Sequence, residues 1–280
     1  MKSDNHNADS LKMLAKIDEQ ANAELSSLST AAINIGVSDL VTEVTGTVGV
    51  DVAGVNTIAK AVDIEVDSNV ESSHSLESAS YGIASGSGLG MTADVKSNTT
   101  LNIGGELNAD TVDITTNTNR LSKIDYSSSA GGGISVTSIR VDNKVNGESV
   151  INLDNYTPSK DYANKLTISH NSENTQDTVS SSVSGGALSI STASVGGELD
   201  SKTSLNIKNS DINLDNDINI SVNNTNIVKD SASMTNGGVI AIVSNNVNHT
   251  YGSGTAITVD NSKISAKNLI MKAISKVKNA

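Results

Sequence analysis

The sequence SLNIKNSDINLDNDINISVNN, residues 204–224, contains the two patterns that decide the fold of this chain. The first is LNIKN (205–209), where two aliphatic residues alternate with polar ones before a closing asparagine. The second is DNDINISV (215–222), where three aliphatic residues alternate with polar ones. Alternation with a period of two is typical of a strand that buries one face.

The second pattern occurs six times along the chain at nearly constant spacing. Its first aliphatic residues are separated by 51, 50, 54, 52 and 51 positions. A period this regular predicts a repeat protein in which each unit packs on its neighbours. The segments are Ala8–Ala15, Ala59–Val66, Ala109–Thr116, Ala163–His170, Asp215–Val222 and Ala266–Ala273, with first aliphatic residues Leu11, Val62, Val112, Leu166, Ile218 and Leu269.

The first pattern occurs five times, with spacings of 51, 50, 54 and 52 positions. Glycine and asparagine tolerate left-handed backbone angles at low cost. The sequence therefore predicts a short strand that ends in a tight bend once per repeat. The residues expected at these bends are Gly54, Gly105, Asn155, Asn209 and Asn261.

A glycine followed by an apolar residue provides a third landmark, which we expect to open a further strand in each repeat. The only proline, Pro158, falls in residues 155–164 and predicts a loop there, because proline cannot donate a hydrogen bond to a sheet. The glycines of the third landmark are Gly36, Gly88, Gly133, Gly186 and Gly238.

These patterns predict an all-β fold, a β-solenoid with ~51-residue repeats and a thin core of aliphatic ladders. Each repeat could form two coils, or one coil and a projecting β-arm. Residues 1–280 are expected to form a single array of about five repeats, a fragment of a longer chain. For residues 1–28 we expect a strand in the intact array, with a frayed or helical end as the alternative.

Composition limits the classes of partner. The net charge of −12 disfavours nucleic acid and anionic lipid surfaces. The absence of cysteine excludes disulfides and thiolate chemistry. No apolar stretch is long enough for membrane insertion, and the first twenty residues lack the apolar segment of a signal peptide.

The sequence predicts no catalytic residue, no cofactor and no metal site. An enzyme acting on acidic polysaccharides needs clustered carboxylates with a cationic group, and the only arginines are Arg120 and Arg140. The glycine-rich segments Gly86–Gly90 and Gly131–Gly133 lack the features of a phosphate-binding loop and are expected to be turns or small-residue packing sites. The histidines occupy no common repeat position, although one ends an aliphatic ladder; they are His6, His74, His170 and His249.

Residues 204–224 and 255–275 (TAITVDNSKISAKNLIMKAIS) resemble the repeat regions of filamentous-haemagglutinin-like adhesins of Gram-negative bacteria, most closely the leukotoxin-type filamentous adhesins. The resemblance implies a right-handed parallel β-helix that is secreted through a partner transporter in the outer membrane. It also implies localisation at the bacterial cell surface, attachment to a host cell surface or extracellular matrix, and, in leukotoxin-type members, toxicity to white cells.

We therefore expect a structural, adhesive stalk segment of a secreted surface protein, without enzymatic activity. One alternative is a receptor-binding module of a cytotoxin. A large exposed apolar patch would favour this alternative, and the sequence alone shows no such patch. The other is a polysaccharide-active β-helix enzyme, which requires a cleft with two close carboxylates and a base.

Overall fold

The computed structural model describes residues 6–158 and 164–279, and for residues 6–8 and 53–58 it describes the backbone alone. These residues form strands and no helix. The strands are β1 (His6–Thr30), β2 (Ile33–Tyr81), β3 (Ala84–Gly131), β4 (Ile134–Tyr156), β5 (Lys165–Gly185), β6 (Leu188–Lys208), β7 (Asp211–Asn213), β8 (Asp217–Gly237), β9 (Ile240–Asp260), β10 (Lys263–Ser265) and β11 (Asn268–Asn279).

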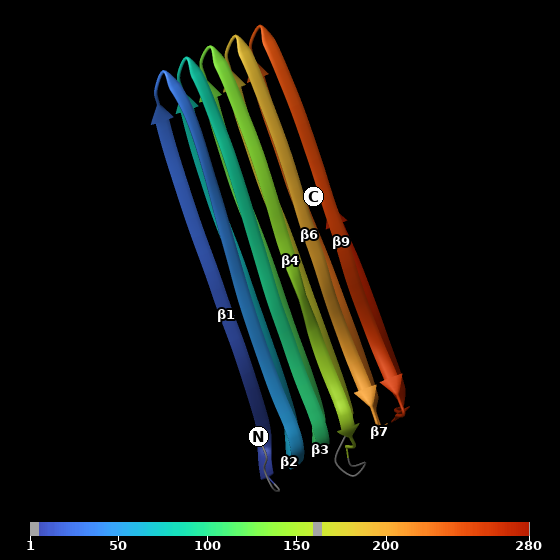
Figure 1. The fold of residues 1–280 in the computed structure, drawn as a ribbon. Coiled ribbons are helices and arrows are strands. Elements are labelled where there is room, and N and C mark those ends of the chain that lie inside the picture. Colours follow the sequence, from blue (N-terminus) through green and yellow to red (C-terminus); the bar gives the residue numbers. More distant parts are fainter. Residues whose placement is uncertain (1–5, 159–163, 280) are drawn as a thin grey trace.

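The long strands form two layers, and every strand pair is parallel. The chain runs along one layer, reverses at a tight turn and returns along the other, so that the molecule is a flattened solenoid (Figure 1). The first layer consists of β1, the second halves of β2 and β3, β5, β8 and β11; the second layer consists of the first halves of β2 and β3, β4, β6 and β9.

Each turn of the solenoid is one flat coil with two long arms. Neither two coils per repeat nor a coil with a projecting arm describes it, because the residues expected to project pair along their whole length with the adjacent turns. An arm of 21 residues, as in β5, is about 70 Å long, and adjacent turns are about 4.8 Å apart. The described part is therefore a thin plate whose longest dimension follows the strands.

The two aliphatic patterns form continuous columns through the interior. Val62 pairs with Leu11 on one side and Val112 on the other, and the column continues through Leu166 and Ile218 to Leu269. The second column contains Val50, Leu101, Ile151, Leu205 and Ile257. The members in the central turns are at most 1% exposed, so these columns form a core.

The predicted left-handed bends are confirmed where the structure describes them. The backbone φ angles are 88° at Gly105, 55° at Asn155, 50° at Asn209 and 46° at Asn261. These residue types accept positive φ with little strain, which explains why the strand ends at the same position in successive turns. Gly54 lies outside the fully described residues.

Two further expectations concern the strand in residues 1–28 and the loop in residues 155–164. Residues 6–28 belong to strand β1, whereas residues 1–5 lie outside the described part of the chain. Pro158 follows β4 and lies outside the strands, as predicted, and residues 159–163 are not described.

The third landmark is partly wrong. Gly133 directly precedes β4, and Gly186 and Gly238 lie two residues before the starts of β6 and β9, but Gly36 and Gly88 lie inside β2 and β3. The glycine of the earlier turn is Gly82, whose N–H donates to the carbonyl of Gly131. The sequence alone did not distinguish the two positions, because Gly82-Ile83 and Gly88-Leu89 both place a glycine before an apolar residue and lie only six residues apart.

The tight turns require glycine because they stack on one another. A Cβ atom on Gly186 would lie 2.2 Å from the carbonyl oxygen of Gly132, whereas a Cβ atom on Gly185 would meet nothing within 4 Å. We expect Gly186→Ala to lower the free energy of unfolding by roughly 2 kcal/mol, because the backbone of the adjacent turn must move. Urea unfolding followed by circular dichroism measures this effect. Gly185→Ala is the matched control, and equal losses in the two variants would contradict the steric explanation.

The interior is not purely aliphatic, which corrects the predicted core. One aliphatic cluster, which includes Ile64 and Ile103, lies next to the left-handed bends, and a second, which includes Met91 and Ile124, lies nearer the tight turns. A polar band separates them, and a serine band fills the space next to the turns. The polar band contains Ser97, Arg120, Ser149, His170, Ser172, Asn174, Asn224 and Asn226; the serine band contains Ser78, Ser80, Ser85, Ser87, Ser128, Ser135, Ser184, Ser189 and Ser191.

Candidate functional site

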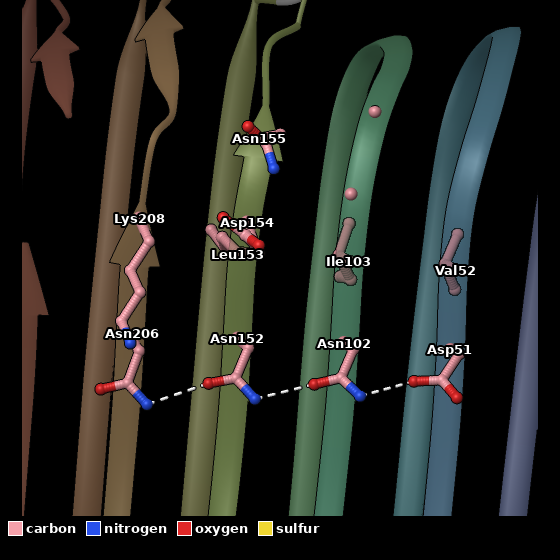
Figure 2. A pocket seen from close by; sticks show the side chains of 12 residues that line it. Asp51, Val52, Asn102, Ile103, Asn152, Leu153, Asp154, Asn155, Asn206 and Lys208 are labelled. Carbon is pink, nitrogen blue, oxygen red and sulfur yellow. Dashed lines mark hydrogen bonds between the residues drawn. The ribbon is translucent and has the colours of Figure 1, made fainter. Parts of the chain in front are cut away.

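A column of amide side chains on the outer face of the second layer is the most regular polar feature of the surface. Asn206 Nδ2 donates to Asn152 Oδ1 at 2.9 Å, and Asn152 Nδ2 donates to Asn102 Oδ1 at 2.7 Å. Asn102 Nδ2 donates in turn to the carboxylate of Asp51 at 2.5 Å. Figure 2 shows these four side chains at the same height on four neighbouring turns. This column is the outer ladder of the second layer.

The outer ladder borders a surface hollow of about 720 Å³ next to the left-handed bends. Gly104 and Gly105 line the hollow together with Asp154 and Lys208. A side chain at Gly104 would approach the carbonyl oxygen of Asp154 to 2.9 Å, so glycine keeps this part of the hollow open. The hollow therefore combines a row of amides with carboxylates and one ammonium group.

The first layer carries two similar ladders. In one, Asn223 donates to Asn171, Asn171 to Asn117, and Asn117 to Asp67, at 3.0, 3.2 and 3.0 Å. The neighbouring ladder runs two residues further along the strands and ends at Asp18. In it, Asn119 donates to Asn69 at 2.7 Å and Asn69 donates to Asp18 at 3.0 Å. These two ladders line a second hollow, of about 620 Å³.

The ladders share one direction. In each, the amide N–H groups point toward the amino-terminal turns and the last acceptor is an aspartate. Shorter ladders follow the same rule: Asn261 and Asn209 lead to Asp154, Asn164 to Asp110, and Asn268 to Asp217. The amide dipoles are therefore aligned, and the carboxylate accepts at the end where N–H groups point, which strengthens the hydrogen bonds.

The parallel register explains why these side chains meet. Opposite residues in a parallel sheet are about 4.8 Å apart, a distance that one amide can bridge to the next. Each amide carries two N–H donors and two acceptor lone pairs, and the ladder uses one of each. In the outer ladder of the second layer, the remaining donors and acceptors of Asn102 and Asn152 are available at the surface for a ligand.

An apolar hollow of about 380 Å³ lies on the outer face of the second layer near the tight turns. Ile33, Ile35 and Val37 are 75%, 79% and 74% exposed along one side of it. Gly86 and Gly88 line it as well, consistent with the expectation that this glycine-rich segment is a small-residue site. The sequence alone did not indicate this exposed apolar patch, and the structure corrects that point. The opposite side consists of Ile134 and Val136.

The two arginines occupy very different environments. Arg140 is exposed, whereas Arg120 is fully buried in the polar band. Its donors bind the backbone oxygens of Ser97 and Glu148 and the side chains of Ser172 and Asn174, at 2.7 to 3.2 Å. These acceptors are uncharged, and burial lowers the pKa of Arg120 to about 10, so the guanidinium remains cationic at neutral pH.

Space for Arg120 is provided from the opposite layer. Gly147 has a φ of 150°, and a Cβ atom there would lie 2.8 Å from Arg120 Nε and 2.0 Å from the carbonyl oxygen of Ser97. Arg120 therefore acts as an internal cross-link between turns and layers. It does not reach either polar hollow, because it is fully buried between the layers.

Two of the histidines, His74 and His170, are buried. His170 is fully buried, contacts Thr116 through Nδ1, and places Nε2 2.9 Å from the carbonyl oxygen of Ser149. Burial lowers the pKa of His170 to about 4, with a further lowering by Arg120 and a partial offset by the Ser149 carbonyl. Burial also lowers the pKa of His74. The side chain of His6 lies outside the described residues.

His249 and Asp230 form a contact between the two layers. His249 Nε2 lies 3.0 Å from Asp230 Oδ2, and the imidazole ring stacks on Tyr251 with ring centroids 6.0 Å apart. Burial raises the pKa of Asp230, and His249 partly offsets that shift. In the residues that the structure describes, no three histidine, cysteine or acidic side chains gather as a metal-binding group.

Comparisons with known proteins return no matching family model, no matching curated protein and no matching solved structure. Within the described ranges, no helix has the length and apolar character needed to span a membrane. The observed class is an all-β parallel solenoid, consistent with a parallel β-helix.

Proposed function

We propose that this chain is a stalk segment of a secreted bacterial surface adhesin, built as a right-handed parallel β-helix with repeats near 51 residues. The observation that carries the proposal is the set of outer asparagine ladders, which repeat the same polar contact on successive turns. A solenoid holds such contacts at fixed spacing because each turn packs only on its neighbours. The sequence resemblance to filamentous-haemagglutinin-like adhesins supports the same function.

The ladders would contact a host cell surface or extracellular matrix. A ligand rich in hydroxyl groups can both donate to and accept from the unused positions of each amide. The acidic surface of the chain, with a net charge of −12, favours an uncharged or cationic ligand over an anionic one. Single contacts of this kind are weak, so attachment arises from many parallel contacts on a long stalk.

The test compares attachment of the chain to host epithelial cells in two forms, soluble and coupled densely to beads. Dense display should tighten binding by about 10²–10⁴-fold over the soluble chain, because contacts on one bead act together. The double variant Asn102→Ala with Asn152→Ala should lower bead attachment by roughly tenfold. The matched control removes two exposed asparagines of the same layer that belong to none of the ladders above, Asn246 and Asn248.

A receptor-binding module of a cytotoxin is the second candidate, and the exposed apolar hollow favours it. The double variant Ile35→Ser with Val136→Ser removes apolar surface from both sides of that hollow. Loss of attachment in this variant, with the asparagine variant unaffected, would support the receptor-binding module and exclude the ladder as the adhesive surface. Attachment that neither variant changes would contradict both functions.

A further inference from the structure

The two ends of the solenoid carry opposite charge. Residues 6–52, which form the first turn, contain seven acidic residues and two lysines. Residues 240–279, which follow the last tight turn, contain five lysines and one acidic residue. A chain that is strongly acidic overall is therefore acidic at its first turn and basic at its last.

Among the residues that the structure describes, the outermost strands of the first layer are β1 and β11, and each has a strand neighbour on one side only. Their inward side chains match. In the register of the sheet, Leu269, Met271 and Ala273 of β11 occupy the columns that begin with Leu11, Met13 and Ala15 of β1. The two edge strands therefore present the same inward side chains, leucine, methionine and alanine in that order, to any strand that pairs with them.

We propose that copies of this chain associate head to tail, with β11 of one copy pairing in parallel with β1 of the next. In the register that continues the aliphatic columns, Leu269 faces Leu11 of the second copy. The same register places Lys276 opposite Asp18. Opposite charges directly across two strands stabilise the pair, and unpaired strand edges favour such additions.

Charge also determines the direction of association. Two β1 edges would bring together acidic strands, and two β11 edges would bring together basic strands, so symmetric dimers are disfavoured. The β11–β1 contact is heterologous and does not close, and it therefore produces linear filaments. In the second layer, the same stacking leaves a gap as wide as one strand between β9 of one copy and residues 33–52 of the next copy. The two copies are therefore joined only through the strands of the first layer.

Glu19 limits the strength of the contact. It shares the inward column of the buried Val70, and in the junction it would face Val277 of the other copy. A carboxylate between apolar side chains opposes association, because it loses water without gaining a partner. The neutral variant Glu19→Gln should therefore tighten self-association, by about threefold to tenfold.

Sedimentation velocity over a range of protein concentrations tests the charge pairing. Wild-type chain should form linear oligomers at low salt, and these should dissociate as salt is raised. Asp18→Lys and Lys276→Asp should each weaken association roughly tenfold, because each replaces an attraction by a repulsion. An equal mixture of the two variants should recover association as oligomers in which the two variants alternate. Lys276 of the Asp18→Lys copy then lies opposite Asp18 of the other copy, and at the next junction the aspartate at position 276 lies opposite the lysine at position 18.

Lys165→Asp is the matched control, since it changes the charge by the same amount in β5, a central strand. It should leave association unchanged. A wild-type chain that remains monomeric at low salt would overturn the proposal. So would mixed variants that fail to associate, or a Glu19→Gln variant that associates more weakly than wild type while its circular dichroism spectrum is unchanged.

Discussion

Arg120→Ala is expected to lower the free energy of unfolding by about 4 kcal/mol, the largest effect of any single substitution considered for this chain. The variant loses every hydrogen bond of the guanidinium and leaves the backbone oxygens of Ser97 and Glu148 buried without that donor. A buried acceptor without a partner costs about 1–3 kcal/mol, and the cavity adds to this loss. Urea unfolding at pH 7, followed by circular dichroism, measures the difference.

The chain contains its own control for this experiment. Arg140 is the only other arginine and is exposed on the outer face, so Arg140→Ala should change the free energy of unfolding by less than about 0.5 kcal/mol. Arg120→Met should fall between the two, because it fills the space and avoids burying a charge but still leaves the acceptors unpaired. If Arg120→Ala unfolds at the same urea concentration as Arg140→Ala, the cross-link does not stabilise the fold.

The register of the solenoid could be predicted from the sequence because a few residues have only one suitable environment. In the segments that begin at Leu205 and Ile218, aliphatic residues alternate with polar ones, which identifies the buried face. Asn209 closes the first pattern at the position where only glycine or asparagine bends the chain at low cost. Both features repeat in phase, and the structure places them in columns.

The polar interior could not be predicted in the same way. In residues 67–75, DSNVESSHS, both faces of the strand are largely polar, so alternation does not reveal which side is buried. Small polar side chains can be buried here because the parallel register aligns their donors and acceptors, as where Thr137 Oγ1 donates to Ser191 Oγ at 2.9 Å. The outer ladders were missed for a related reason, since asparagine is common throughout the chain and only exact register shows which ones meet.

The exposed and buried ladders use the same chemistry with different consequences. Asn174 Nδ2 lies 2.8 Å from Asn226 Oδ1 inside the polar band, where the bond offsets the loss of water. Asn152 and Asn102 make a similar bond at the surface, where water competes and the unused donors remain accessible. The interior ladders therefore contribute mainly to stability, whereas the outer ladders are the ones suited to binding.

His170 makes stability depend on pH in a direction set by its lowered pKa. The pKa is about 4 in the folded chain, against an ordinary value of 6.5. Above pH 6.5 the imidazole is neutral in both states and its contribution is fully present. As pH falls from 6.5 toward 4, the unfolded chain takes up a proton that the folded chain does not, so stability is lost. At pH 4.5 the loss from this residue is about 2.5 kcal/mol.

The loss should be measured as a difference between wild type and His170→Thr, since threonine occupies the adjacent position of the same column at Thr116. Urea unfolding at pH 7 and pH 4.5 should show that wild type loses about 2.5 kcal/mol more than the variant. The contribution of His74 is common to both chains and cancels in the comparison. Between pH 7 and pH 8 the two chains should differ by a constant amount, because His170 is neutral there in both states. Equal losses of stability in acid would show that burial does not keep His170 neutral. They would also contradict the low-dielectric environment that His170 is expected to share with Arg120.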